Sequence, residues 1–144
     1  MRRLHAAVAD WAGWSNDIVS YQLDVEHEDE VHNGLIALQR FADCDLPRAV
    51  DVVNGILTAR LREFESIRDN ELPALSDDMR LSPEDRAALT GHVRAWQDWI
   101  AGWLAWHLRT GRYTDFRTQS TLPTLLRRGP VGLGTAAARI GASA

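Results

Sequence analysis

Three oxygen-bearing side chains recur at intervals of four near the start of the chain, in the stretch WSNDIVSYQLDVEHEDE at residues 14–30. They are the amide of Asn16, the hydroxyl of Ser20 and the carboxylate of Asp24. On an α-helix, positions i, i+4 and i+8 lie above one another on one face, so these groups would point the same way. All are hard oxygen donors of the kind that Mg²⁺ accepts, with waters and phosphate oxygens completing its octahedron. The set suits a site for a metal ion and a diphosphate.

The spacing by itself also fits a plain solvated helix face. Small polar residues at intervals of four are common on amphipathic helices, and on this pattern alone the solvated face is favoured by roughly three to one. The acidic run that follows, up to Glu30, is interpreted as a solvated helix end and not as additional ligands. A magnesium site therefore needs support from other parts of the sequence.

Composition limits the function classes that are open to the chain. Its 144 residues fit one domain, and 45% hydrophobic with 25% charged residues is typical of a globular protein. The net charge of −4 argues against the broad basic surface that nucleic-acid binding requires. Cys44 is the single cysteine, which excludes an internal disulfide and favours a reducing cytoplasm. No run is apolar enough for a signal peptide or a membrane span, so we expect no membrane partner.

Apolar residues recur at helical spacing along most of the chain, and no stretch alternates as a strand would. We therefore expect an all-α fold of about four main helices. Asp45 with Pro47, and Ser82 with Pro83, have the cap-and-proline pattern of helix starts. The expected helices are 3–29, 31–42, 45–71 and 82–110, with a linker at 73–81. Helical residues 1–114 would be followed by an irregular tail at 115–144, rich in Thr, Gly, Pro and Arg.

The last expected helix carries a stripe of tryptophans at intervals of three, four and three. Its members are Trp96, Trp99, Trp103 and Trp106. Packing into the core is favoured over lining a cavity by about four to one, because such a stripe is how an amphipathic helix buries area. Any part of the stripe that stays exposed would favour self-association.

The histidines show no spacing typical of a zinc site, neither H-E-x-x-H nor a pair at i, i+4. They are His5, His27, His32, His92 and His107. We expect them at the surface.

The string NDIVSYQLD at residues 16–24 resembles the second metal-binding motif of class I terpene synthases, N-D-x-x-S-x-x-x-E. Four segments are similar, in the same order, to bacterial sesquiterpene cyclases and most of all to germacradienol and geosmin synthases. They are NDIVSYQLDVEHEDEVHNGLIALQRF, LTARLREFE, ELPAL and QDWIAGWLAWHLRTGRY. The tail segment GPVGLGTAAARI extends the resemblance, which runs from about residue 14 to residue 140.

This resemblance implies part of a class I terpenoid synthase helical bundle that uses Mg²⁺ and farnesyl diphosphate. Asn16, Ser20 and Asp24 match the motif positions that hold one magnesium ion. Arg112 and Tyr113 match an Arg-Tyr pair that contacts the diphosphate once the site closes. The implied reaction ionises the allylic diphosphate, releases it, and cyclises the carbocation in an apolar cavity. No separate catalytic acid or base is assigned.

The sequence departs from the family pattern in three places. The aspartate-rich D-D-x-x-D/E motif is absent, and the nearest string, Asp77-Asp78-Met79-Arg80-Leu81, lacks the third acid and follows the Asn16 motif. Asp24 replaces the usual Glu, and Leu23 stands where a basic residue is common. The chain thus resembles only the C-terminal half of a catalytic domain. The alternative hypothesis is a catalytically inactive helical remnant that self-associates or pairs with a full-length synthase.

Overall fold

A computed structural model describes residues 1–26 and 32–113. These residues form only helices and turns, which confirms the all-α prediction. The helical segments are α1 (Arg2–Glu26), α2 (Gly34–Ala42), α3 (Leu46–Ser66), the π-helical turn η1 (Ile67–Glu71), α4 (Leu72–Asp78), α5 (Pro83–Arg109) and the 3₁₀ turn η2 (Gly111–Tyr113). The tail expected at 115–144 lies outside the described residues.

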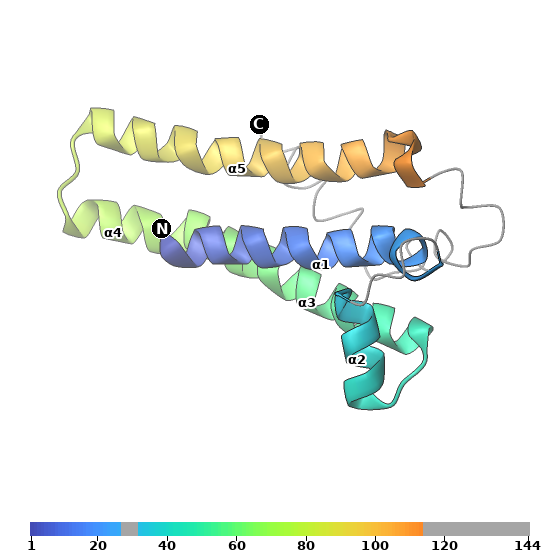
Figure 1. Cartoon of the computed structure of the whole chain (residues 1–144). Helices are drawn as coiled ribbons and strands as arrows, with labels where there is room; N and C mark the ends of the chain where they lie inside the picture. Colours follow the sequence, from blue (N-terminus) through green and yellow to red (C-terminus); the bar gives the residue numbers. More distant parts are fainter. Residues whose placement is uncertain (27–31, 114–144) are drawn as a thin grey trace.

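Helix α1 is the centre of the arrangement (Figure 1). It packs most extensively on α3 and also contacts α2, α5 and η2. Helices α3, η1 and α4 follow one another along one side of α1, and α5 runs along the other, with α2 projecting near the end of α1 (Figure 1). None of the helices in the described part of the chain combines the length and apolar character needed to cross a bilayer.

The core lies mainly between α1 and α3. Trp11 and Phe64 are its largest fully buried side chains. The large apolar side chains that α3 buries follow intervals of three and four, which places them on one face of the helix. They are Val50, Val53, Leu57, Leu61 and Phe64. Each fully buried side chain of this size contributes about 1.5–3 kcal/mol, so this interface fixes the position of α1.

The segment predicted as a linker at 73–81 is largely helical, so that prediction is wrong for α4. Pro73 stands in the first turn of α4, where its missing N–H costs no helical hydrogen bond. The π-helical turn η1 precedes it, and the N–H of Leu72 donates to the carbonyl of Ile67, five residues back. The proline therefore begins a helix here and does not end one. The chain turns only after Asp78.

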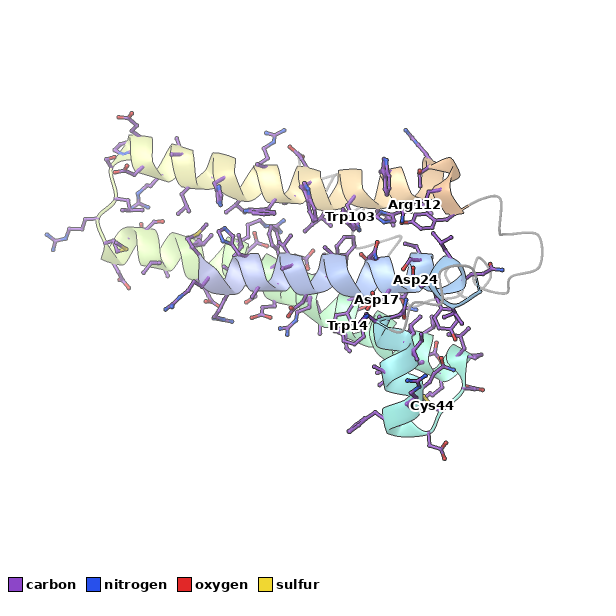
Figure 2. The ribbon with its side chains drawn as sticks, viewed as in Figure 1. Trp14, Asp17, Asp24, Cys44, Trp103 and Arg112 are labelled. Carbon is purple, nitrogen blue, oxygen red and sulfur yellow. The ribbon has the colours of Figure 1, made fainter. Side chains whose placement is uncertain are left out.

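Helix α5 starts as predicted at the Ser82 cap, whose Oγ accepts from the N–H of Asp85 at 3.1 Å. Arg86 links the first turn of α5 to α4. The Arg86 guanidinium donates to the carbonyl of Ser76 at 2.8 Å and forms an ion pair with Asp77 at 2.7 Å. Further along, the indole N–H of Trp103 donates to Ser15 Oγ on α1 at 3.1 Å (Figure 2).

The tryptophan stripe of α5 is only partly in the core. Trp96 and Trp103 are half-buried and pack against the core, whereas Trp99 and Trp106 are 40% and 52% exposed. Core packing is thus confirmed for two of the four. The reason is that α5 packs mainly on α1, so one narrow face is covered. The buried positions on α5 are Val93, Ile100 and His107, at intervals of seven.

Candidate metal and diphosphate site

The predicted metal ligands lie on the second half of α1. Ser20 is buried, with 4% of its surface exposed, while Asn16 and Asp24 are half-buried. Ser20 Oγ donates to Asp24 Oδ2 at 2.6 Å, so the structure brings the hydroxyl and the carboxylate together. Among the described residues, Asn16 forms no hydrogen bond with either of them. It shares their face through its position one turn earlier.

Asn33 is a member of this cluster that the sequence analysis missed. Its side chain is 1% exposed and donates to Asp24 Oδ2 at 3.0 Å and to the carbonyl of Asp17 at 2.9 Å. Its Oδ1 accepts from the N–H of Leu35 at 2.9 Å and so caps α2. An asparagine directly before the apolar run GLIAL is a cap signal that the sequence contained. Its bond to Asp24, however, depends on how α2 docks.

Asp17, which the resembling string includes without a role, faces α2 (Figure 2). Its Oδ2 accepts from the N–H of Gly34 at 3.0 Å. Burial raises the pKa of the Asp17 carboxyl, the negative charge of Asp24 raises it further, and the Gly34 N–H partly offsets both. A Cβ on Gly34 would lie 2.5 Å from the Trp14 ring and 2.7 Å from Asp17 Oδ2. Asp17 thus links α1 to α2 at a point where the two helices are too close for any side chain at position 34.

The donor set suits a magnesium ion by its chemistry, because Mg²⁺ binds hard oxygen ligands. The Ser20 and Asp24 oxygens, 2.6 Å apart in their hydrogen bond, would have to separate to the roughly 2.9 Å of neighbouring ligands in an octahedral Mg²⁺ site. The Ser20 hydroxyl keeps a lone pair while it donates its proton. No group of three or more His, Cys, Asp or Glu side chains in the described ranges is arranged to hold a metal ion. A metal here would therefore depend on the neutral oxygens of Asn16 and Ser20 beside one carboxylate.

The second predicted element of the site, Arg112 with Tyr113, forms η2 directly after α5. This turn packs against α1, and Figure 2 shows Arg112 at the end of the molecule that carries Asp24. Tyr113 is buried and stacks on the ring of His107 at 5.7 Å with an interplanar angle of 11°. The exposed guanidinium of Arg112 lies 5.9 Å from the Tyr113 ring centroid. The turn thus brings an exposed cation to the same end of the molecule as Asp24.

The structure also shows the environment of Leu23 and of the pair Asp77–Asp78, two of the places where the sequence departs from the family pattern. Leu23 is buried, with 8% of its surface exposed, so this position provides an apolar contact and no cation. The pair Asp77–Asp78 closes α4, and the Asp77 carboxylate pairs with Arg86. Asp77 is therefore part of the link between α4 and α5.

Comparison with known proteins gives one family match and several relatives. Residues 1–63 match the family model described as terpene synthase family 2, C-terminal metal binding. A 7-epi-alpha-eudesmol synthase ((2E,6E)-farnesyl diphosphate cyclizing) of Streptomyces viridochromogenes is 33% identical over 113 residues, covering 78% of this chain and 32% of that protein. Isoafricanol synthase of Streptomyces violaceusniger is 31% identical, over 83% of this chain and 31% of that protein.

A fungal protein shows the same extent of similarity. Sesquiterpene synthase 1 of Postia placenta is 31% identical over 78% of this chain and 31% of its own length. The chain thus spans about a third of the length of the curated relatives it matches. The region matched by the family model includes Asn16, Ser20 and Asp24. The comparisons thus show that the chain is similar to sesquiterpene synthases and, over residues 1–63, to the C-terminal metal-binding part of terpene synthase family 2.

Proposed function

We propose that the chain provides the second metal motif and the diphosphate contacts of a magnesium-dependent sesquiterpene synthase. The observation that carries this proposal is the Ser20–Asp24 pair, 2.6 Å apart on α1, with η2 packed against the same helix. The donors are of the right kind for magnesium, and a guanidinium lies at the same end of the molecule.

In this proposal Asn16, Ser20 and Asp24 hold one Mg²⁺ ion, and Arg112 and Tyr113 bind the diphosphate. Magnesium supplies the positive charge that stabilises a departing diphosphate. The Arg112 guanidinium adds charge-assisted hydrogen bonds to its oxygens. Tyr113 is held in place by its stacking on His107 and offers its hydroxyl to the same group.

The proposed substrate is farnesyl diphosphate, which the eudesmol synthase relative cyclises according to its name. The proposed product is a cyclic sesquiterpene, formed in the cytoplasm, where the single cysteine stays reduced. The finer assignment, to the germacradienol and geosmin synthase type, is supported by the ordered segments from NDIVSYQLD to HLRTGRY and by the tail GPVGLGTAAARI.

Calorimetric titration of the chain with inorganic pyrophosphate, with and without Mg²⁺, tests the site. We expect binding that requires Mg²⁺ and that weakens by at least about tenfold in Asn16→Ala and Asp24→Asn. Asp10→Asn is the matched control, because Asp10 is an acid on the same helix that pairs with Arg60. The proposal would be overturned if pyrophosphate bound equally well with and without Mg²⁺, or if its affinity were the same in all the variants.

Turnover is a separate test. The chain is incubated with farnesyl diphosphate and Mg²⁺, and volatile products are sought by gas chromatography. We expect no product from these 144 residues alone, because they contain no D-D-x-x-D/E motif. A terpene hydrocarbon or alcohol would show that the aspartate-rich D-D-x-x-D/E motif is dispensable.

An inactive, self-associating helical remnant is the second candidate function. It is favoured by the exposed apolar side chains of α5, with Trp106 at 52% and Leu108 at 57%. Light scattering coupled to size exclusion distinguishes the two functions. A dimer that Trp106→Glu dissociates, together with no pyrophosphate binding, would favour the remnant.

A further inference from the structure

Two histidines from different helices meet at the opposite end of α1 from the candidate diphosphate site. His5 on α1 and His92 on α5 are both exposed, and their Nε2 atoms lie 3.2 Å apart. Their rings are tilted by 59° with centroids 5.5 Å apart. The sequence does not indicate this histidine pair, because the two are 87 positions apart and only the packing of α5 on α1 brings them together.

The hydrogen bonds show which ring nitrogen carries a lone pair. The indole N–H of Trp96 donates to His92 Nε2 at 3.1 Å, so that nitrogen is an acceptor in the neutral ring. His5 Nε2 faces the same atom, where it must either share this acceptor or present a second lone pair. In the tautomer that carries its proton on Nδ1, His5 presents this lone pair, and two imidazole lone pairs 3.2 Å apart can bind one transition-metal ion together.

We propose that His5 and His92 form a two-histidine site for a borderline transition-metal ion, with Zn²⁺ as the reference ion. With Zn–N bonds of 2.0–2.1 Å, two nitrogens 3.2 Å apart subtend an angle of about 100° at the metal, close to tetrahedral. Both side chains are open to solvent, so waters complete the coordination. The ion displaces the Trp96 N–H from His92 Nε2, and that indole is itself half-buried beside the site.

The consequence of this site is a cross-link between α1 and α5. Helix α5 packs mainly on α1, so an ion bound to one residue from each helix resists their separation. The site differs from the proposed magnesium site in ligand type, nitrogen against oxygen. It is also distant, since Asn16 follows His5 by 11 positions, or about 16 Å along the helix.

Thermal unfolding of the chain in Zn²⁺, followed by circular dichroism, tests the proposal. We expect a Tm that rises with Zn²⁺ concentration, and calorimetric Zn²⁺ binding that weakens by at least about tenfold in both His5→Gln and His92→Gln. His32→Gln, a change at another exposed histidine, is the control and should bind as the unmodified chain does. Mg²⁺ should not reproduce the rise, because it prefers oxygen ligands.

The two variants carry exposed substitutions, and their metal-free Tm values show whether each one folds. If the unmodified chain shows neither a Tm rise nor heat of Zn²⁺ binding, the proposal is overturned. Equal binding by His5→Gln, His92→Gln and the unmodified chain also overturns it, because Zn²⁺ would then be bound elsewhere.

Discussion

The side-chain amide of Asn33 donates to the carboxylate of Asp24 at 3.0 Å, from the residue that caps α2 to the acid of the candidate metal site. Because Asp24 Oδ2 also accepts from Ser20, that oxygen is held by two donors. The orientation of the proposed metal ligand thus depends on a buried residue outside the motif. The start of α2 and the end of α1 form one unit.

Replacing Asn33 should be costly for this reason. Asn33→Ala removes the three hydrogen bonds of a buried side chain and leaves the Leu35 N–H without its cap, so we expect a loss of about 2–4 kcal/mol in the free energy of unfolding. Denaturant titration measures it. Ser82→Ala, which removes an exposed cap, should cost about 1 kcal/mol. Equal losses in the two variants would contradict a role for Asn33 beyond capping.

A methyl group at Gly34 should force α1 and α2 apart. Its Cβ would meet the Trp14 ring at 2.5 Å and Asp17 Oδ2 at 2.7 Å, so we expect Gly34→Ala to destabilise the chain by about 1–3 kcal/mol. Gly55→Ala is the matched control. Gly55 is exposed within α3 with nothing near its Cβ position, so that change should stabilise by about 0.5–1 kcal/mol. Thermal melts of both variants give the comparison.

The raised pKa of Asp17 predicts how stability depends on pH. A carboxyl whose pKa is raised on folding stabilises the fold at pH values below the pKa of the unfolded chain, which is about 3.9. That stabilisation is lost as the pH rises through the pKa of the folded chain. Asp17→Asn should therefore be more stable than the unmodified chain at pH 7 in the absence of metal. The difference should disappear near pH 3, as measured by urea titrations across this range.

Glu63 supplies a control of opposite sign for that experiment. Its pKa is lowered, chiefly by the hydrogen bond that it accepts from Arg60. Its contribution to folding stability is therefore present at pH values above the pKa of the unfolded chain and is lost as the pH falls through the lowered pKa of the folded chain. Glu63→Gln should thus be less stable at pH 7, with a difference that also shrinks in acid. If the stability differences of Asp17→Asn and Glu63→Gln had the same sign at pH 7, the environments assigned to the two carboxyl groups would be contradicted.

A buried asparagine in α3 should be replaceable with a gain in stability. Asn54 is 1% exposed, and neither its Oδ1 nor its Nδ2 has a hydrogen-bond partner among the described residues. Because an unpaired buried amide is costly, Asn54→Leu, of similar size, should raise the free energy of unfolding by about 1–2 kcal/mol. Chemical denaturation measures this change. A clear loss in Asn54→Leu would mean that the amide has partners in solution.

Local chemistry explains what the sequence predicted well. Asp45 and Ser82 cap their helices as expected, with Asp45 Oδ1 accepting from the Arg48 N–H at 3.0 Å, because a cap depends only on residues within one turn. The grouping of Ser20 with Asp24 has the same origin, since both lie on one helical face. Helix starts and the shared face of Ser20 and Asp24 could therefore be predicted from short stretches of sequence, whereas their role as metal ligands stays a prediction.

The features that were missed depend on tertiary packing. The Asn33–Asp24 bond requires α2 to dock on α1, and the His5–His92 pair requires α5 to lie along it. The exposure of Trp99 depends on which neighbours cover α5. The linker predicted at 73–81 is helical over α4 because Pro73 is accommodated by the π-helical turn before it, which no local pattern indicates.

The π-helical turn at residues 67–71 affects which single-residue deletions the chain tolerates. A π turn holds one residue more than an α turn, and each residue of an α-helix advances the backbone by about 100°. Deleting one residue from this segment would convert the π turn into an α turn and produce a continuous α-helix, with α4 keeping nearly the same rotational phase on α3. Arg86 would then keep the Ser76 carbonyl that anchors the start of α5. Deleting a residue from the regular part of α3 would instead rotate everything after it by roughly 100°, so the π turn is the place in this helical run where the chain tolerates the loss of one residue.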